Sequence, residues 1–267
     1  MERTCLFVLG MHRSGTSATA GALCSAGISF GDNFIDKKPE NPRGFFEDAR
    51  INRRNSRLLA ERGLSWYSIL PKKKLHTLLA CERSDDFIED ICQYLDETFP
   101  EGIFAIKEPR CCLLLPLYNE VFERLGIRVR ALVVRRDYDE VAMSLHRRDQ
   151  IPRFYGFALA NFYNQLIDDG VPRFWNDSRE LTYSRLLSDP EQEISSVLDW
   201  LGIAKDESKM EGVREFLDPA LRHGDASQHS GIRRRVFLAS SNFIINFAPF
   251  DCAKVIRRSH RLSGCAT

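Results

Sequence analysis

The stretch that most constrains the fold is residues 4–23, "TCLFVLGMHRSGTSATAGAL". Residues 4–9 form a continuous apolar run, which is typical of a strand covered on both faces of a parallel sheet. A loop from Gly10 to Gly15 follows, with four residues between the two glycines, and the small residues after it predict a helix that ends near Gly27. A strand, a glycine-framed loop and a helix in this order predict a phosphate-binding loop.

The rest of the chain alternates between the two kinds of element. An alternation of strands and helices predicts an α/β fold, a three-layer sandwich with a central, mostly parallel sheet. The length of 267 residues is sufficient for a single domain spanning residues 1–267, in which the segment 205–267 is the least regular part. We predict further strands within 102–110, 127–137 and 179–189, and helices within 48–62, 84–98, 138–149, 153–169, 190–203 and 236–262.

Three polar segments fall where predicted strands end. They are "GMHRSGTS", "IKEPR" and "VVRRD". Ligands of open parallel sheets bind at the carboxyl ends of the strands. We therefore expect these segments to meet in one crevice.

The loop has the features of an anion site without a metal. Backbone N–H groups of residues 13–17 would lie at a helix N-terminus, which favours an anion. Arg13 adds a permanent charge, and hydroxyl groups come from Ser14, Thr16 and Ser17. A magnesium-dependent nucleotide triphosphatase would need Lys in place of Thr16 and an acidic residue at a strand end. The third strand ends in Arg135 and Arg136 instead, so we expect a second anion site and no metal.

With these motifs in order, the sequence resembles the sulfotransferases that use 3′-phosphoadenosine 5′-phosphosulfate (PAPS). The segment "RSGTS" is similar to the family's 5′-phosphosulfate loop, and "RDYDEVAMS" to its 3′-phosphate motif. "NPRGFFED", "IKEPR" and "YSRLLSDPEQEISSVLDWLGI" resemble further family segments, so that the likeness covers residues 4–204. The resemblance implies a P-loop sulfotransferase architecture with PAPS at Arg13, Ser14, Gly15, Thr16, Ser17, Arg136 and Ser144, or at Arg135 if the register shifts by one.

The resemblance also implies roles in sulfuryl transfer. Arg13 would stabilise the leaving group and the sulfuryl oxygens, with Lys107 as a second cation. A general base must accept the acceptor's proton; Glu47 is our first candidate, Glu108 the second and His12 the third. The late "RKG" segment of cytosolic members has no good counterpart, since "HSGIRRR" at 229–235 fits it poorly.

Net charge, hydropathy and cysteine spacing limit the kinds of partner and the cellular location that we expect. A net charge of +1 gives no reason to expect nucleic acid binding, and the first apolar run is too short for a secretory signal or a membrane span. Eight cysteines without zinc spacing indicate reduced thiols and a cytoplasmic location.

The sequence leaves the acceptor open. A small molecule, glycan or lipid with a hydroxyl or amine group fits equally well, and so does a monomer or a homodimer. Two other functions also remain: a P-loop kinase or nucleotide triphosphatase, and an inactive relative that keeps the nucleotide pocket.

Overall fold

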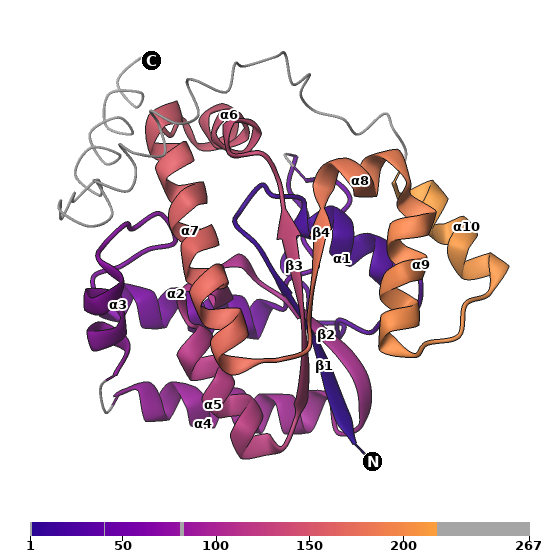
Figure 1. Ribbon diagram of the computed structural model, residues 1–267. Helices are drawn as coiled ribbons and strands as arrows, with labels where there is room; N and C mark the ends of the chain where they lie inside the picture. The colour runs from indigo at the N-terminus through magenta and orange to yellow at the C-terminus, as the bar shows by residue number, and fades with distance from the viewer. Residues whose placement is uncertain (1, 40, 81–82, 218–267) are drawn as a thin grey trace.

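A single parallel sheet organises the molecule. The computed structural model describes residues 2–39, 41–80 and 83–217 (Figure 1). Its strands have the order β2-β1-β3-β4, and the three pairings between these strands are parallel. The predicted α/β fold with a mostly parallel sheet is thus confirmed. The strands are β1 (Arg3–Leu9), β2 (Gly102–Lys107), β3 (Arg128–Arg135) and β4 (Ser178–Thr182).

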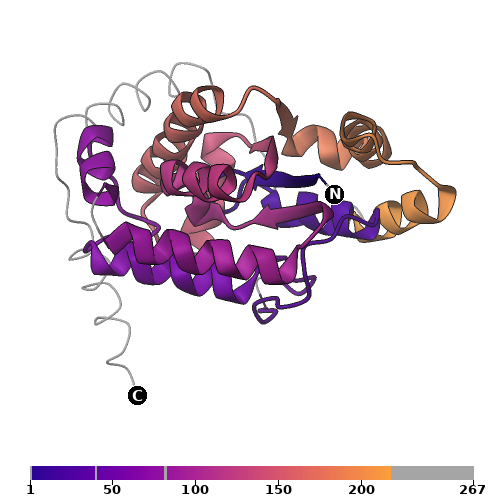
Figure 2. The same cartoon turned by 90° about the horizontal axis from the view of Figure 1, so that it is seen from below.

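Helices cover both faces of this sheet (Figures 1 and 2). Cys5, Phe7 and Leu9 of β1 pack into one core, with α2, α4, α5 and α7, whereas Leu6 and Val8 pack into the other, with α1, α9 and α10. The alternation of strand side chains therefore produces the three layers. The helices are α1 (Thr16–Ser25), α2 (Ala49–Glu61), α3 (Lys72–Leu79), α4 (Arg83–Thr98), the 3₁₀ helix η1 (Pro109–Leu113), α5 (Leu115–Leu125), α6 (Tyr138–Asp149), α7 (Arg153–Phe174), α8 (Tyr183–Ser188), α9 (Pro190–Leu201) and α10 (Glu207–Phe216).

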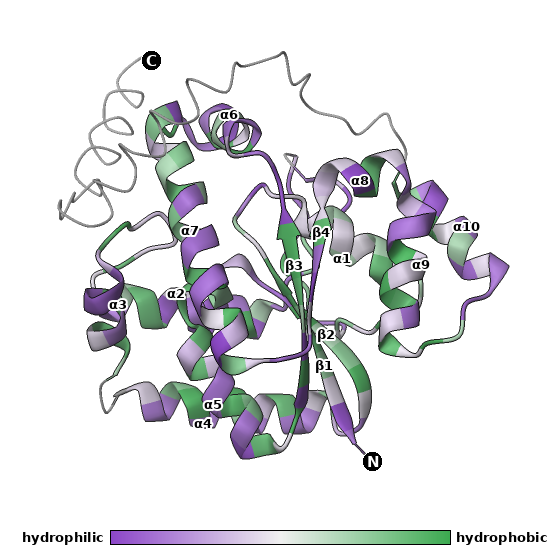
Figure 3. Ribbon diagram, in the orientation of Figure 1, coloured by the Kyte–Doolittle hydropathy of each residue, from purple (hydrophilic) through white to green (hydrophobic). Residues whose placement is uncertain are grey.

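Hydropathy follows the layers. Figure 3 shows hydrophobic residues gathered along the strands and the helix faces next to them, with hydrophilic residues outside. The aromatic residues of α7 belong to the core, as expected from their helical spacing, apart from the half-exposed Phe154. No helix in the described part of the chain is long and apolar enough to cross a membrane.

Helix ends near the site follow local capping rules. The Asp48 carboxylate accepts hydrogen bonds from the N–H groups of Arg50 (2.8 Å) and Ile51 (2.9 Å), so that α2 begins directly after the irregular loop 31–47. The Asp137 carboxylate does the same for Asp139 (2.9 Å) at the start of α6. Such caps satisfy N–H groups that the first helical turn leaves unpaired.

The structure also contains elements that the sequence did not indicate. Helices α5 and α10 were not expected, and α7 continues five residues beyond the predicted end at 169. Within the predicted strand segment 179–189, β4 ends at Thr182 and the short helix α8 follows. The predicted helix within 236–262 and the basic segment 222–235 lie outside the described residues.

Candidate functional site

The loop between β1 and α1 has an unusual backbone. Arg13 has φ = 68° and Gly15 has φ = 96°, both in the left-handed region. A positive φ is uncommon for a residue other than glycine, and such strained positions cluster at functional sites. Helix α1 begins at Thr16, and its first turn contains no acidic side chain. Its N-terminal amides are therefore free of a competing carboxylate and favour an anion.

Close packing explains the second glycine of the loop. A Cβ atom at Gly15 would lie 2.2 Å from the ring of Tyr183, the first residue of α8. The guanidinium group of Arg136 lies over the same ring, 4.6 Å from its centroid. The loop, the end of β4 and the residue after β3 thus meet at Tyr183.

Arg13, Arg136 and Ser144 form one cluster. Arg13 Nε donates to Ser144 Oγ at 2.8 Å, and Arg136 donates to the Arg13 carbonyl oxygen at 3.1 Å. Arg136 also pairs with Glu140 at 2.7 Å. Burial lowers the pKa of Arg13, and the nearby charges of Arg148 and Arg136 lower it further. An anion bound here would relieve the repulsion among these cations.

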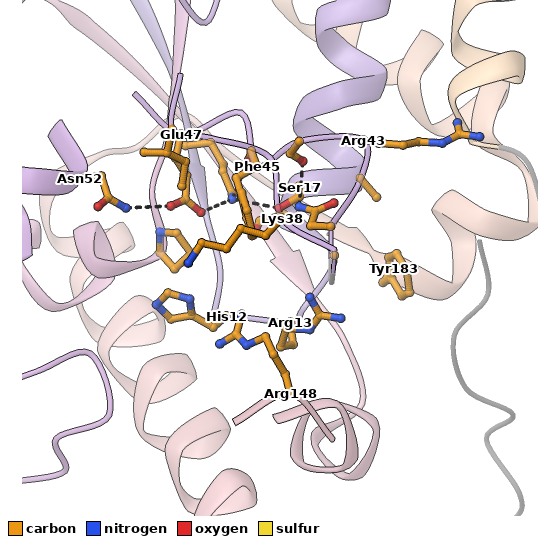
Figure 4. A pocket seen from close by; sticks show the side chains of 18 of the residues that line it. His12, Arg13, Ser17, Lys38, Arg43, Phe45, Glu47, Asn52, Arg148 and Tyr183 are labelled. Atoms are coloured by element: carbon orange, nitrogen blue, oxygen red, sulfur yellow. Dashed lines mark hydrogen bonds and ion pairs between the residues drawn. The ribbon is translucent and has the colours of Figure 1, made fainter. Parts of the chain in front are cut away.

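Lys107 at the end of β2 forms a buried ion pair. Its Nζ atom lies 2.6 Å from Glu47 Oε1, and the two side chains are 1% and 6% exposed. The ammonium group also donates to the Phe45 carbonyl oxygen (3.0 Å) and to Ser17 Oγ (3.1 Å). Asn52 of α2 donates to the other Glu47 oxygen at 2.9 Å (Figure 4). Lys107 therefore joins the sheet, loop 31–47 and the phosphate-loop helix.

Glu108, the next residue, lies wholly inside the protein. Its side chain is 0% exposed and pairs with Arg110 at 2.5 Å. Asn55 of α2 donates to the same carboxylate at 2.6 Å and accepts a hydrogen bond from the Tyr118 hydroxyl at 2.8 Å. Burial raises the pKa of Glu108, although the charge of Arg110 acts in the opposite direction. This chain of contacts ends at the Arg110 guanidinium group.

His12 belongs to the loop, and its ring packs against an aromatic side chain. Its ring is 4.5 Å from the ring of Trp66, and its side chain is buried. The Nε2 atom has no hydrogen-bond partner among the described residues. Burial holds the pKa of His12 well below its usual value, and the positive charges of Arg110, Arg148, Lys107 and Arg13 lower it further. The ring is therefore neutral at pH 7.

These groups surround one pocket of about 390 Å³ at the carboxyl ends of the strands. The crevice expected from the three polar segments is present, since each of them contributes to its wall. Ser14 is turned inward and donates to the Met11 carbonyl oxygen, while Glu108 and Ser144 are buried behind the wall. The predicted residues that line the pocket are His12, Arg13, Gly15, Thr16, Ser17, Glu47, Lys107 and Arg136.

Arg135 is placed elsewhere. Its guanidinium group pairs with Glu180 at 2.8 Å and contacts Asn164 and Asp168 of α7. Arg135 is the last residue of β3, whereas Arg136 follows the strand and turns toward the loop. The alternative register, with Arg135 as the phosphate ligand, therefore does not correspond to this geometry.

Sequence reasoning missed several residues of the pocket. They come from segments that are distant in sequence, and each looks ordinary by itself. An arginine within a helix-ending "HRRD" carries no signal for a ligand site. The missed residues are Lys38, Arg43, Asn52, Trp66, Arg148, Asp149, Tyr183 and Phe216. Among the described residues, no group of three or more His, Cys, Asp or Glu side chains could hold a metal ion.

Comparison with known proteins identifies the fold. The sulfotransferase domain of the Synechococcus PCC 7002 olefin synthase superimposes with a TM-score of 0.54 over 90% of this chain and 95% of that domain, at 14% identity. The chain has the sulfotransferase fold. Sulfotransferase STF9 from Mycobacterium avium matches with a TM-score of 0.51 and 14% identity, over 94% of this chain and 77% of that protein. No protein-family model matches the sequence, and no curated protein sequence matches it. The relationship is therefore visible in the fold alone.

Proposed function

We propose that this protein transfers a sulfuryl group from PAPS to a hydroxyl or amine group of a small molecule, glycan or lipid. The observation that carries the proposal is the pair of cationic positions, Arg13 and Arg136, at the ends of β1 and β3, where an ATP enzyme would have Lys and an acidic metal ligand. The sulfotransferase fold of the chain supports the same reaction class.

The residues present fit such a donor. The strained turn at Arg13 and Gly15 and the acid-free start of α1 suit an anionic group. Arg136 fits a second phosphate, because it is held beside Arg13 and stacked on Tyr183. Ser144 would act through Arg13, because its Oγ atom accepts a hydrogen bond from Arg13 Nε. When bound, PAPS supplies the activated sulfuryl group.

The chain's own groups then stabilise the charge that develops. Arg13 faces the pocket and offers its remaining N–H groups to the sulfuryl oxygens and the leaving phosphate oxygen. Lys107 adds a second charge, and its three contacts keep it in place before any ligand binds. Such preorganised charges need no rearrangement during the reaction.

A base must take the proton of the acceptor. We propose Glu47, because its carboxylate lines the pocket next to Lys107. His12 is the second candidate, since its neutral ring also lines the pocket and has a free Nε2 atom. Glu108 is the least suited of the three, because its carboxylate is completely buried.

Calorimetry with 3′-phosphoadenosine 5′-phosphate (PAP), with ATP and magnesium as the control, tests donor recognition. We expect PAP to bind more tightly than ATP; the reverse preference would favour a kinase or nucleotide triphosphatase. Transfer of labelled sulfate from PAPS to an acceptor panel then tests catalysis. PAP binding without transfer to any acceptor would favour an inactive nucleotide-binding relative.

Variants assign the roles. Arg13→Ala should abolish transfer while the fold remains intact, and Arg136→Ala should weaken PAP binding more than it slows turnover. Glu47→Gln should reduce turnover at unchanged PAP affinity, by about 10²–10⁴-fold if it is the base. Arg57→Ala, which changes an exposed arginine of α2 outside the pocket, is the matched control. Wild-type binding and turnover in both arginine variants of the pocket would refute the site.

A further inference from the structure

The pocket extends beyond the residues assigned to the donor. At this end lie His12, Trp66, Arg110 and Arg148, together with Lys38 from loop 31–47. Figure 4 shows Lys38 reaching into the pocket on the side of His12 and Glu47, away from Arg43 and Tyr183. Among the described residues, no carboxylate oxygen lies within 4 Å of Lys38 Nζ. We call this group the distal subsite.

Arg110 is held in the distal subsite by a buried chain of polar groups. The Tyr118 hydroxyl contacts Asn55, Asn55 contacts Glu108, and Glu108 pairs with Arg110. A fully buried carboxylate is costly unless its partners compensate it. Glu108 holds Arg110 through one terminal nitrogen, Nη1. A guanidinium group has five N–H donors, so that others remain for a ligand, in an orientation fixed in advance.

A second arginine is fixed by an aromatic surface. The guanidinium group of Arg148 lies 5.6 Å from the centre of the Trp66 ring and pairs with Asp149 at 2.7 Å. The Trp66 carbonyl oxygen accepts a hydrogen bond from the Tyr163 hydroxyl at 2.7 Å, which ties this segment to α7. The Trp66 backbone is therefore tied to α7, while its ring packs against the core and against His12.

His12 provides an independent sign of a ligand. Its side chain is 9% exposed, lines the pocket, and leaves Nε2 without a partner in the described part of the chain. A buried polar atom of this kind is costly unless a ligand or water satisfies it. The positive charges around the ring make an oxyanion a favourable neighbour.

We infer that the distal subsite binds an oxyanionic group, a carboxylate, sulfate or phosphate, carried by the acceptor a few bonds from its reacting hydroxyl. The inference rests on the proposed function and specifies its substrate class. The negative charges of PAPS repel an anionic acceptor. The positive charges of Arg110, Arg148 and Lys38 attract it and so offset this repulsion. The planar guanidinium groups match oxyanions by paired hydrogen bonds.

Matched acceptor pairs test the inference with labelled PAPS. The pairs are glucuronate against glucose, 4-hydroxybenzoate against 4-methylphenol, and 12-hydroxydodecanoate against 1-dodecanol; glucose 6-sulfate and glucose 6-phosphate distinguish the kinds of oxyanion. We expect kcat/KM to be at least tenfold higher for the acidic member of the preferred pair. Equal or faster reaction of the neutral members overturns the inference, and so does PAP binding without transfer to any acidic probe.

Variants show whether the distal subsite is responsible. Arg148→Gln and Lys38→Gln should each reduce kcat/KM for the acidic probe by about 10- to 100-fold relative to the neutral probe, the size of one charged hydrogen bond. Lys38→Gln should also leave PAP affinity unchanged, whereas Arg148 lies close enough to Arg13 to act on the donor as well, so that only the ratio of the two probes is compared for Arg148→Gln. Arg57→Gln is the control. Arg110→Gln alone would leave the buried Glu108 carboxylate without its charged partner. The Arg110→Gln substitution is therefore combined with Glu108→Gln in one double variant. Equal losses for acidic and neutral probes overturn the inference, whereas failure of PAP to bind the wild-type protein overturns the proposed function itself.

Discussion

The buried pair of Lys107 and Glu47 allows a quantitative test of the site. Lys107→Met leaves the Glu47 carboxylate buried, with Asn52 as its one remaining described donor. Removing one partner of a buried pair costs about 3–5 kcal/mol of unfolding free energy. Glu47→Gln keeps an oxygen for the ammonium group, which also retains Phe45 and Ser17, so we expect a smaller loss of about 1.5–3 kcal/mol.

The double variant removes both charges and leaves neither of them unpaired. Its loss should therefore be smaller than the sum of the two single losses by at least about 1 kcal/mol, because contacting residues are not additive. Domains of this kind unfold with about 5–15 kcal/mol, so that losses of this size leave a folded protein over the upper part of the range. Urea unfolding followed by circular dichroism measures each value by linear extrapolation.

An exposed pair in the same protein supplies the control. Arg57 and Glu61 lie 2.8 Å apart on α2, with side chains 68% and 35% exposed. The cycle of Arg57→Met and Glu61→Gln should give a much smaller coupling than the buried pair, because solvent screens exposed charges. If Lys107→Met lies within 1 kcal/mol of the wild type, or if the two cycles give the same coupling, the buried ion pair described here does not exist in solution.

Three further predictions concern the loop and its support. Gly15→Ala should prevent PAP binding and lower the melting temperature, because the new methyl group meets the Tyr183 ring and the backbone has a positive φ; wild-type PAP affinity by calorimetry would contradict this. The unfolded chain binds a proton at the usual histidine pKa of about 6.5, above the pKa of buried His12. The contribution of the neutral His12 ring to the free energy of unfolding is therefore complete above about pH 6.5. As the pH falls below this value the free energy of unfolding decreases, by at most about 1.4 kcal/mol per pH unit. In His12→Gln, the free energy of unfolding measured with urea should depend less steeply on pH in the acid range. An unchanged pH dependence would count against a buried neutral ring. Tyr118→Phe removes the hydroxyl group that donates a hydrogen bond to Asn55. The free energy of unfolding should fall by about 1–3 kcal/mol in the same assay, and no loss would mean that the hydrogen bond does not form.

The side of the pocket formed by the loop after β1 could be predicted because it is local in sequence. The apolar run of β1, the glycine frame and the start of α1 occupy consecutive residues, and their geometry follows from them. The choice between Arg135 and Arg136 could not be made in this way. It depends on where β3 ends, because the last strand residue contacts α7 while the next one turns to the loop.

The distal subsite was not predictable for the opposite reason. Trp66 follows α2, Arg148 lies near the end of α6, and Lys38 belongs to an irregular loop. No spacing connects these three residues, and tertiary packing alone brings them together. Helix α5 was missed because its first residues continue a short apolar run, from Leu113 to Leu117, in which strand and helix patterns cannot be distinguished.

Carboxylates near the pocket have a role here that differs from metal binding. An ATP enzyme uses acidic residues beside its phosphate loop to hold magnesium, whereas in the described part of this chain four acidic residues near the pocket each pair with a cation. Fixing the cations before a ligand arrives avoids the cost of ordering long side chains later, which is how a preorganised site stabilises developing charge. The pairs are Lys107 with Glu47, Arg110 with Glu108, Arg136 with Glu140 and Arg148 with Asp149.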